Sequence, residues 1–302
     1  MLDPIVPSYQ RCMKMQVAAR LSPMESRKRQ SHLAKRKTVT LDQLFVLLLS
    51  SILMALPIST MAQEQSFPSP TPTGTMGSKD SGAVTEIEEY LQAVSVSGWQ
   101  DIKGMGTLTY PTGDAHTASL YLMGSKYSRL DIATDSGTRS LRLIGSVGRF
   151  QDEKGNQGSL PPAASCTGIV AFPRLRIDVT TSPLLSLSDQ KMYAGTGQSL
   201  HRITIAYPLD SSSGSSLSKK TVATDLYFDP NTHLLVYSVD SLTFNNVKNS
   251  LVRVTSYGSY QSFNGVLIPT VIRQILNGQE QWTLQLNEVT INTNPPASTF
   301  SF

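Results

Sequence analysis

The feature that most constrains the fold is a series of short strand-like runs between Met105 and Ile291. Each run is bounded by Gly, Pro, Asp or Ser, and turn signals separate the early runs at intervals of about ten residues. This spacing predicts an antiparallel meander or barrel rather than βαβ units. The expected strands are 105–110, 116–123, 126–132, 139–144, 147–151, 200–207, 221–228, 234–242, 250–263, 266–276 and 281–291.

One helix is expected ahead of the first strand. Thr85 and Glu88 form a capping-box pattern, in which each side chain reaches the other residue's backbone N–H. Apolar residues then recur at helical spacing as far as Val94, which leaves Glu88 and Glu89 on the solvent face. Gly98 is expected to end this helix.

Residues 151–199 interrupt the strand pattern with several Gly and Pro residues and two apolar patches, 169–172 and 184–187. A loop of this length inside a compact domain is usually functional or has structure of its own. Short helices or turns packed against the sheet are therefore expected here. Residues 209–220, rich in Ser and Lys, predict an exposed and mobile hairpin loop.

The N-terminal region predicts export. A mostly apolar run at 44–56 follows the basic residues 35–37, and the small residues Thr60 and Ala62 fit a signal-peptidase site. Residues 1–62 are therefore expected to be a leader cleaved after Ala62, which would place the product in the periplasm or outside the cell. An uncleaved signal anchor is the alternative, although a membrane span needs about 20 apolar residues. Residues 63–80 predict a flexible Pro/Ser/Thr linker, and 81–302 a single β-rich domain.

Charge and cysteine content narrow the classes of partner. The chain has 26 Lys+Arg and 22 Asp+Glu, but residues 1–62 hold nine of the bases and three of the acids, so 17 bases and 19 acids follow. That balance argues against nucleic acid and anionic membrane surfaces as partners. Cys166 is the single cysteine after residue 62, so no disulfide framework is expected. It is expected to be a small buried residue, with an intermolecular bridge as the alternative.

The residues that usually carry chemistry form no recognisable motif. His116, His201 and His233 are far apart in the sequence, and none has a His or Cys partner at ligand spacing. No Gly-x-Ser-x-Gly motif is present. Neither a catalytic site, a metal site nor a cofactor is therefore expected, and an exported hydrolase remains an alternative only if carboxylates converge in space. Gly104 and Gly106 are expected to mark a bend or bulge in a strand.

Two stretches near the C-terminus carry a family resemblance. Residues 225–240 (DLYFDPNTHLLVYSVD) form a strand, a turn and a returning strand, and 257–300 contain two Asn-Gly pairs that suit type I′ turns. Over 225–300 this series resembles the periplasmic lipoprotein-carrier (LolA/LolB-like) superfamily. The resemblance implies an opened antiparallel half-barrel wrapped around helices, whose concave face holds acyl chains or apolar peptide segments. The insertions at 151–199 and 209–220 depart from a minimal carrier, and no carrier-specific functional residue can be matched.

The expected function follows from that resemblance. The chain is expected to be a non-catalytic exported protein that binds a lipid, a lipoprotein acyl chain or a hydrophobic peptide in the half-barrel cavity. The alternative is an envelope sensor or protein-interaction module, in which the patches 169–172 and 184–187 fill the core. The candidate cavity-lining residues are Trp99, Leu120, Leu122, Leu141, Leu143, Phe172 and Trp282.

Overall fold

The computed structural model describes residues 67–71, 75, 77–95, 100–124, 127–144, 147–160, 180–183, 185–208, 221–242 and 251–301. The expected leader, Trp99, Cys166, Phe172 and the loop 209–220 lie outside these ranges. No helix within these ranges is long and apolar enough to cross a membrane.

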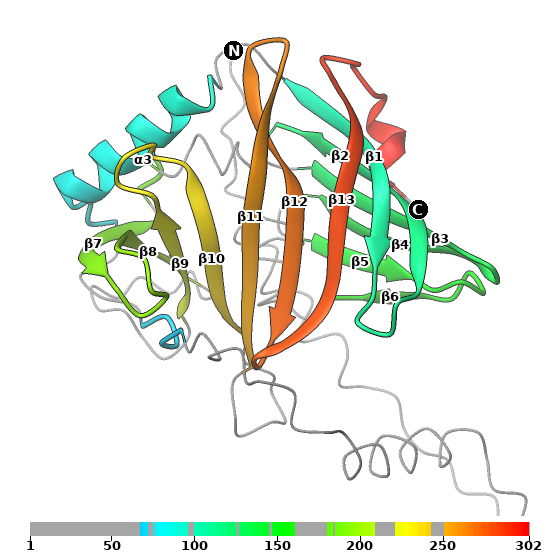
Figure 1. Ribbon diagram of the computed structural model, residues 1–302, viewed down its shortest axis with the longest axis horizontal. Helices are drawn as coiled ribbons and strands as arrows, with labels where there is room; N and C mark the ends of the chain where they lie inside the picture. The colour runs from blue at the N-terminus through cyan, green and yellow to red at the C-terminus, as the bar shows by residue number, and fades with distance from the viewer. Residues whose placement is uncertain are drawn as a thin grey trace, which may run out of the picture.

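The described strands form one open antiparallel sheet of 13 strands in the order β6-β5-β4-β3-β2-β1-β13-β12-β11-β10-β9-β8-β7. The sheet is curved, and helix α3 lies on its inner side (Figure 1). This architecture confirms the mainly β, half-barrel class predicted from the sequence. The strands are β1 Asp101–Thr109, β2 Ala115–Met123, β3 Tyr127–Thr134, β4 Gly137–Ile144, β5 Val147–Gln151, β6 Gln157–Ser159, β7 Ser186–Tyr193, β8 Leu200–Pro208, β9 Thr221–Phe228, β10 Leu235–Leu242, β11 Leu251–Phe263, β12 Val266–Leu276 and β13 Gln279–Ile291.

The strand order divides the sheet into two meanders of consecutive strands. One runs from β1 to β6 and the other from β13 back to β7, and the two meet where β1 pairs with β13. Ile102 lies opposite Ile291 and Leu108 opposite Leu284 in that junction. Strands β6 and β7 are left as the edges, so the sheet does not close into a barrel.

The expectation for residues 151–199 was wrong where the structure describes it. Strands β6 and β7 occupy parts of a segment in which short helices or turns were expected. Strand β7 pairs with β8 along one side, and on the other Leu187 forms a parallel bridge with Lys79. The pairing with β8 is a local hairpin, whereas the Lys79 bridge comes from a distant part of the chain, and the Pro and Gly residues of this segment indicate neither pairing.

Helix α3 (Ser81–Ala93) begins four residues before the predicted cap. Asp80, not Thr85, is the N-cap, because its carboxylate accepts the backbone N–H of Gly82 at 3.0 Å. The helix ends with Val94 as C-cap, ahead of the predicted stop at Gly98. The buried residues of the helix are Ala83, Glu86, Ile87 and Tyr90.

The glycine predictions are confirmed at the junction of the meanders. The register of β1 with β13 shifts between Met105 and Gly106, which is a β-bulge. A Cβ on Gly106 would lie 1.9 Å from the carbonyl oxygen of Gln285, so only glycine fits there. Because β13 has one extra residue at the bulge, its side-chain alternation shifts by one position there. Apolar side chains on both sides of the bulge can therefore face inward. The apolar side chains of β13 that pack in the core are Trp282, Leu284, Leu286, Val289 and Ile291.

Both Asn-Gly hairpins also have the predicted backbone. Asn264 and Gly265 have φ of 49° and 82°, and Asn277 and Gly278 have φ of 48° and 79°. Positive φ at both central residues is what a type I′ turn requires, and Asn and Gly tolerate it best. These turns fix the register of β11 with β12 and of β12 with β13.

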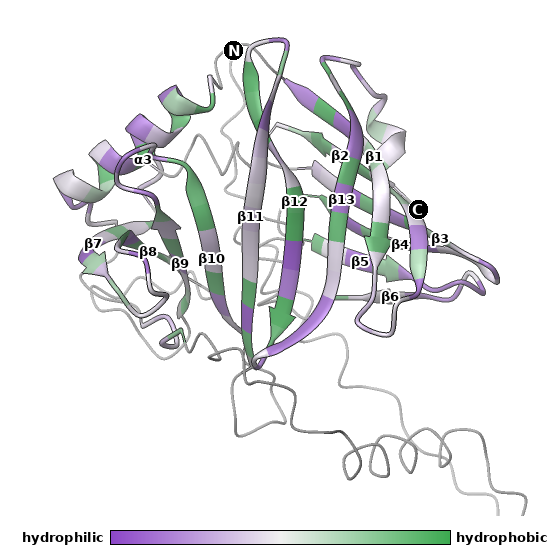
Figure 2. Ribbon diagram, in the orientation of Figure 1, coloured by the Kyte–Doolittle hydropathy of each residue, from purple (hydrophilic) through white to green (hydrophobic). Residues whose placement is uncertain are grey.

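The sheet has two apolar clusters, and hydrophobic and hydrophilic residues alternate along several of its strands (Figure 2). The concave cluster is the larger and includes α3. On the convex face Phe67 packs against Tyr227 and Tyr237, with ring centroids 5.1 and 5.0 Å apart. Phe67 lies in the segment expected to be a linker, and these contacts hold it against the sheet. The 3₁₀ helix η3 (Ala297–Phe300) packs on the convex side of β3 through Phe300 and Tyr127.

Candidate functional site

The concave side of the sheet carries one apolar surface that spans both meanders. Leu120 on β2 lies opposite Leu130 on β3, and Leu130 lies opposite Leu141 on β4. Across the junction, Leu108 on β1 lies opposite Leu284 on β13. Directly opposed residues point to the same face of a sheet, and Gly104, which lies opposite Leu120, shares its face of β1 with Leu108, so these side chains all lie on one face.

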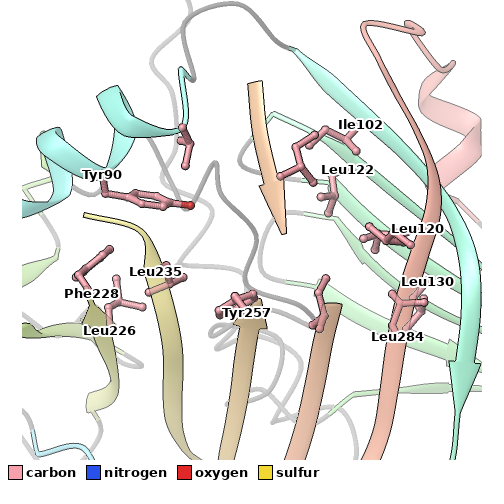
Figure 3. Close-up of a cluster of buried hydrophobic side chains, with 14 of the residues drawn as sticks. Tyr90, Ile102, Leu120, Leu122, Leu130, Leu226, Phe228, Leu235, Tyr257 and Leu284 are labelled. Carbon is pink, nitrogen blue, oxygen red and sulfur yellow. The ribbon is translucent and has the colours of Figure 1, made fainter. Parts of the chain in front are cut away.

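The second meander and α3 contribute the remaining side of this surface. Leu226, Phe228, Leu235 and Tyr257 point toward the side on which Leu120 and Leu130 lie (Figure 3). Helix α3 joins them through Tyr90, whose ring centroid lies 5.5 Å from that of Phe228. Leu226 and Phe228 face inward while the intervening Tyr227 belongs to the convex cluster, as strand alternation requires.

Two buried hydroxyls on this apolar surface, those of Tyr90 and Ser128, have no hydrogen-bond partner among the described residues. The Tyr90 side chain is 1% exposed, and its Oη has no hydrogen-bond partner among the described residues. Burial raises the pKa of this phenol well above its usual value, and the neighbouring Tyr260 and Tyr257 raise it further. An unpaired buried hydroxyl costs about 1–3 kcal/mol. Its oxygen points from α3 into the space between the two meanders (Figure 3).

The structure brings together those predicted lining residues that it describes. Leu120, Leu122, Leu143 and Trp282 are 1–8% exposed and belong to the concave cluster, and Leu141 is partly buried against it. Whether they line a ligand site stays a prediction. Trp99 and Phe172 lie outside the described residues.

Sequence reasoning missed a polar cluster beside this surface. Glu86 and Glu89 of α3 meet His201 of β8 and His233 of the turn between β9 and β10. Glu86 is buried, and its two carboxylate oxygens lie 2.7 Å from His201 Nδ1 and 3.2 Å from His233 Nδ1. The contacts span more than a hundred residues of sequence, so a search for ligands at local spacing could not find them. The available signal was the three-residue spacing of Glu86 and Glu89, which places both on one helix face.

His201 links the helix to the sheet edge. Its Nδ1 lies 2.7 Å from Oε2 of Glu86, and its Nε2 lies 2.9 Å from Oδ1 of Asp189 on β7. Burial alone would lower the pKa of His201, but the hydrogen bonds to Asp189 and Glu86 outweigh burial and raise it. Burial alone would likewise raise the pKa of Asp189, yet hydrogen bonds from His201 and Lys191 lower it to about 2. The imidazolium form of His201 satisfies both carboxylates, because only that form has two N–H donors.

Comparison with known proteins gives distant structural matches. A scan of protein-family models and a search of curated proteins found no match. The chain is similar to a LolA superfamily protein from Nitrosomonas europaea, with 13% identity and a TM-score of 0.47 over 73% of this chain and 97% of that one. It is also similar to a DUF1329 family protein from Desulfovibrio piger, with 10% identity and a TM-score of 0.39 over 72% and 96% of the two chains.

A third match is a chain of the MucA/MucB complex of Pseudomonas aeruginosa, with 9% identity and a TM-score of 0.19 over 69% of this chain and 95% of that one. The Nitrosomonas protein is from the superfamily that residues 225–300 resemble.

Proposed function

We propose that this chain is an exported, non-catalytic binding protein that holds one apolar ligand against the concave side of its sheet. The ligand class is an acyl chain of a lipid or lipoprotein, or a hydrophobic peptide segment. The observation that carries the proposal is the continuous apolar surface that crosses the β1–β13 junction on the inner side of an open sheet. The proposed place of action is the periplasm or the cell exterior.

Two features of the concave side favour a ligand of this kind. Its apolar residues come from both meanders and from α3, so a long chain lying along it would be enclosed on several sides. Burial of apolar area contributes roughly 25 cal/mol per Å² before the cost of association. Ligand sites typically combine apolar walls with few polar groups, and the buried Tyr90 hydroxyl is one such polar group here. It would donate a hydrogen bond to a carbonyl or ester oxygen of the ligand.

A second candidate function is a protein-interaction module whose core is filled by its own side chains. The observation that favours it is the low exposure of the concave residues, with Leu120 at 1% and Leu284 at 0%. In that case a partner would bind elsewhere on the molecule. The two candidates differ in whether an apolar molecule enters the concave side.

Native mass spectrometry of the purified protein is the first test. The protein is isolated gently from cells that export it, and then incubated with phospholipid and with palmitate as defined probes. A co-purifying or added lipid mass supports the first candidate. A mass of the chain alone, unchanged by either probe, contradicts it and favours the interaction module.

Two variants test whether the bound mass lies on the concave side. Tyr90→Phe removes only the unpaired hydroxyl, so the ligand-free fold should be unchanged or slightly more stable while ligand retention falls. Leu120→Asp places a charge on the inner face and should abolish uptake, whereas Thr117→Asp, at an exposed position of the same strand, should not. If Leu120→Asp unfolds the protein and Tyr90→Phe leaves any lipid signal unchanged, the concave side is not the ligand site.

A further inference from the structure

We infer that Glu86, Glu89 and His233 hold a divalent transition-metal ion, best matched by Zn²⁺, where α3 meets the turn between β9 and β10. Glu86 and Glu89 lie three residues apart on one face of α3. His233 lies in a turn shaped by Asp229, whose carbonyl accepts the His233 backbone N–H at 2.8 Å. One ligand atom from each of the three side chains lies within 4.8 Å of the other two.

The distances fit a shared cation better than a shared proton. The His233 Nδ1 lies 3.2 Å from an oxygen of Glu86 and 3.2 Å from an oxygen of Glu89. An N–H shared between two oxygens makes two longer and weaker bonds, whereas charge-assisted hydrogen bonds are usually about 2.7–2.9 Å. Zinc bonds to nitrogen and oxygen of about 2.0–2.1 Å place neighbouring tetrahedral ligands about 3.3–3.4 Å apart. Nδ1 is thus placed as a ligand atom beside two carboxylate ligands.

The residues behind these ligands have the arrangement expected around a metal. Oε1 of Glu86 faces His233, while Oε2 accepts the hydrogen bond from His201. His201 is in turn held by Asp189, and Lys191 donates to Asp189 at 2.9 Å. Such outer hydrogen bonds fix the orientation of a ligating carboxylate. The chain from Lys191 to Glu86 therefore orients the ligand that is most buried.

Charge and exposure also favour a bound cation. Three carboxylates, of Glu86, Glu89 and Asp189, converge here, and Lys191 forms an ion pair with Asp189. The side chains of His233 and Glu89 are 33% and 44% exposed, so an ion can enter from solvent and keep a water as its fourth ligand. One imidazole and two carboxylates suit zinc better than calcium, which prefers oxygen ligands alone.

The bound ion would fasten α3 to the sheet. Glu86 and Glu89 belong to the helix, and His233 belongs to the connection between two strands. A ligand that binds only the folded state adds stability in proportion to the logarithm of its concentration over Kd. Zinc would therefore stabilise the position of α3 at the rim of the concave side, whatever that side binds.

Metal titration of the purified protein, made without a histidine tag and stripped with a chelator, tests this site. We expect one Zn²⁺ per chain by calorimetry, a rise in Tm on adding Zn²⁺, and a Co²⁺ absorption spectrum typical of a four-coordinate ion. Glu89→Gln should weaken Zn²⁺ binding at least about tenfold, as should His233→Asn. Asparagine tolerates the positive φ of 54° at His233, so this variant removes the imidazole without straining the turn.

Glu88→Gln is the matched control, because Glu88 is exposed on the same helix and is not one of the three clustered side chains. It should bind Zn²⁺ like the unmodified protein. Equal affinity of Glu89→Gln and Glu88→Gln, or no Zn²⁺ uptake at all, would overturn the assignment. Binding of Ca²⁺ without Zn²⁺ would overturn it too, since an oxygen-only site would then be indicated. Circular dichroism of Glu89→Gln confirms that loss of binding is not loss of folding.

Discussion

At the scale of single residues, Gly106 is a position at which the backbone leaves no room for a side chain. Its missing Cβ leaves room for the carbonyl oxygen of Gln285 at the bulge that joins the two meanders. Gly106→Ala should lower the free energy of unfolding by about 2–3 kcal/mol, because backbone must move to admit the methyl group. Gly258→Ala is the control, since a Cβ there meets nothing within 4 Å. Urea denaturation gives the free energy of unfolding of both variants. Equal values would contradict the prediction and show that the backbone at the bulge moves at no cost.

A buried ion pair on β10 and β11 offers a second test at this scale. Arg253 donates through Nε and Nη2 to one oxygen of Asp240 at 3.0 and 2.6 Å, and Thr224 donates to the other at 2.6 Å. Arg253→Met should cost about 3–5 kcal/mol, because it leaves a buried carboxylate without its cation. Adding Asp240→Asn should restore most of that loss in chemical denaturation. A double variant as unstable as the single one would mean that the arginine acts by packing alone.

At the scale of elements, the attachment of α3 to the sheet edge should depend on pH through Asp189. Its folded pKa of about 2 is below its ordinary value of 3.8, so the carboxylate stabilises the fold above 3.8 and this stabilisation is lost as the pH falls toward 2. Asp189→Asn should therefore be less stable than the unmodified protein near neutral pH. That difference should shrink between pH 4 and pH 2, which urea titrations in metal-free buffer measure. A pH-independent difference would assign the effect to lost packing.

Comparison of the strands and of α3 with the sequence-based predictions shows which features local sequence patterns can predict. Strands with regular alternation and chemically defined turns, such as β12 and its Asn-Gly hairpins, were predicted with their bounds and turn backbone. Strand β7 was missed, although it forms a local hairpin with β8, and its bridge to Lys79, more than a hundred residues away, has no local signal. The α3 cap was misplaced, because Asp80 and Thr85 both have capping chemistry and only the backbone selects between them.

The residues of the candidate sites also fall into two groups, those that a local sequence pattern can predict and those that it cannot. Leu120 and Leu122 could be assigned to one face of one strand, since alternation is a local property. The cluster of Glu86, His201 and His233 could not, because it exists only after α3 has docked on the edge of β7 and β8. Tertiary pairing, not local pattern, brings these groups together.

At the scale of the whole molecule, two locally connected meanders depend on one long-range pairing. Strands β1 and β13 are remote in sequence, yet their pairing joins the two meanders. The apolar cluster on the concave side includes residues from both meanders. Strand β6 has three residues and a single strand neighbour, whereas β7 has β8 on one side and a bridge to Lys79 on the other. Stability in such a sheet should fall from the junction toward β6.

Amide hydrogen exchange followed by mass spectrometry measures this gradient. Peptides from β1, β12 and β13 should exchange slowest, since these strands are paired on both sides and bury the inner residues Leu108, Ile272 and Leu284. Peptides from β6 should exchange fastest among the strands, and β7 should be slower than β6 because Asp80 N–H and Leu187 N–H both bond across the Lys79 bridge. If β6 exchanged as slowly as β13, the sheet would open as one cooperative unit. A graded opening would instead let the β6 edge move while the junction stays paired, which would widen the access of an apolar ligand to the concave side.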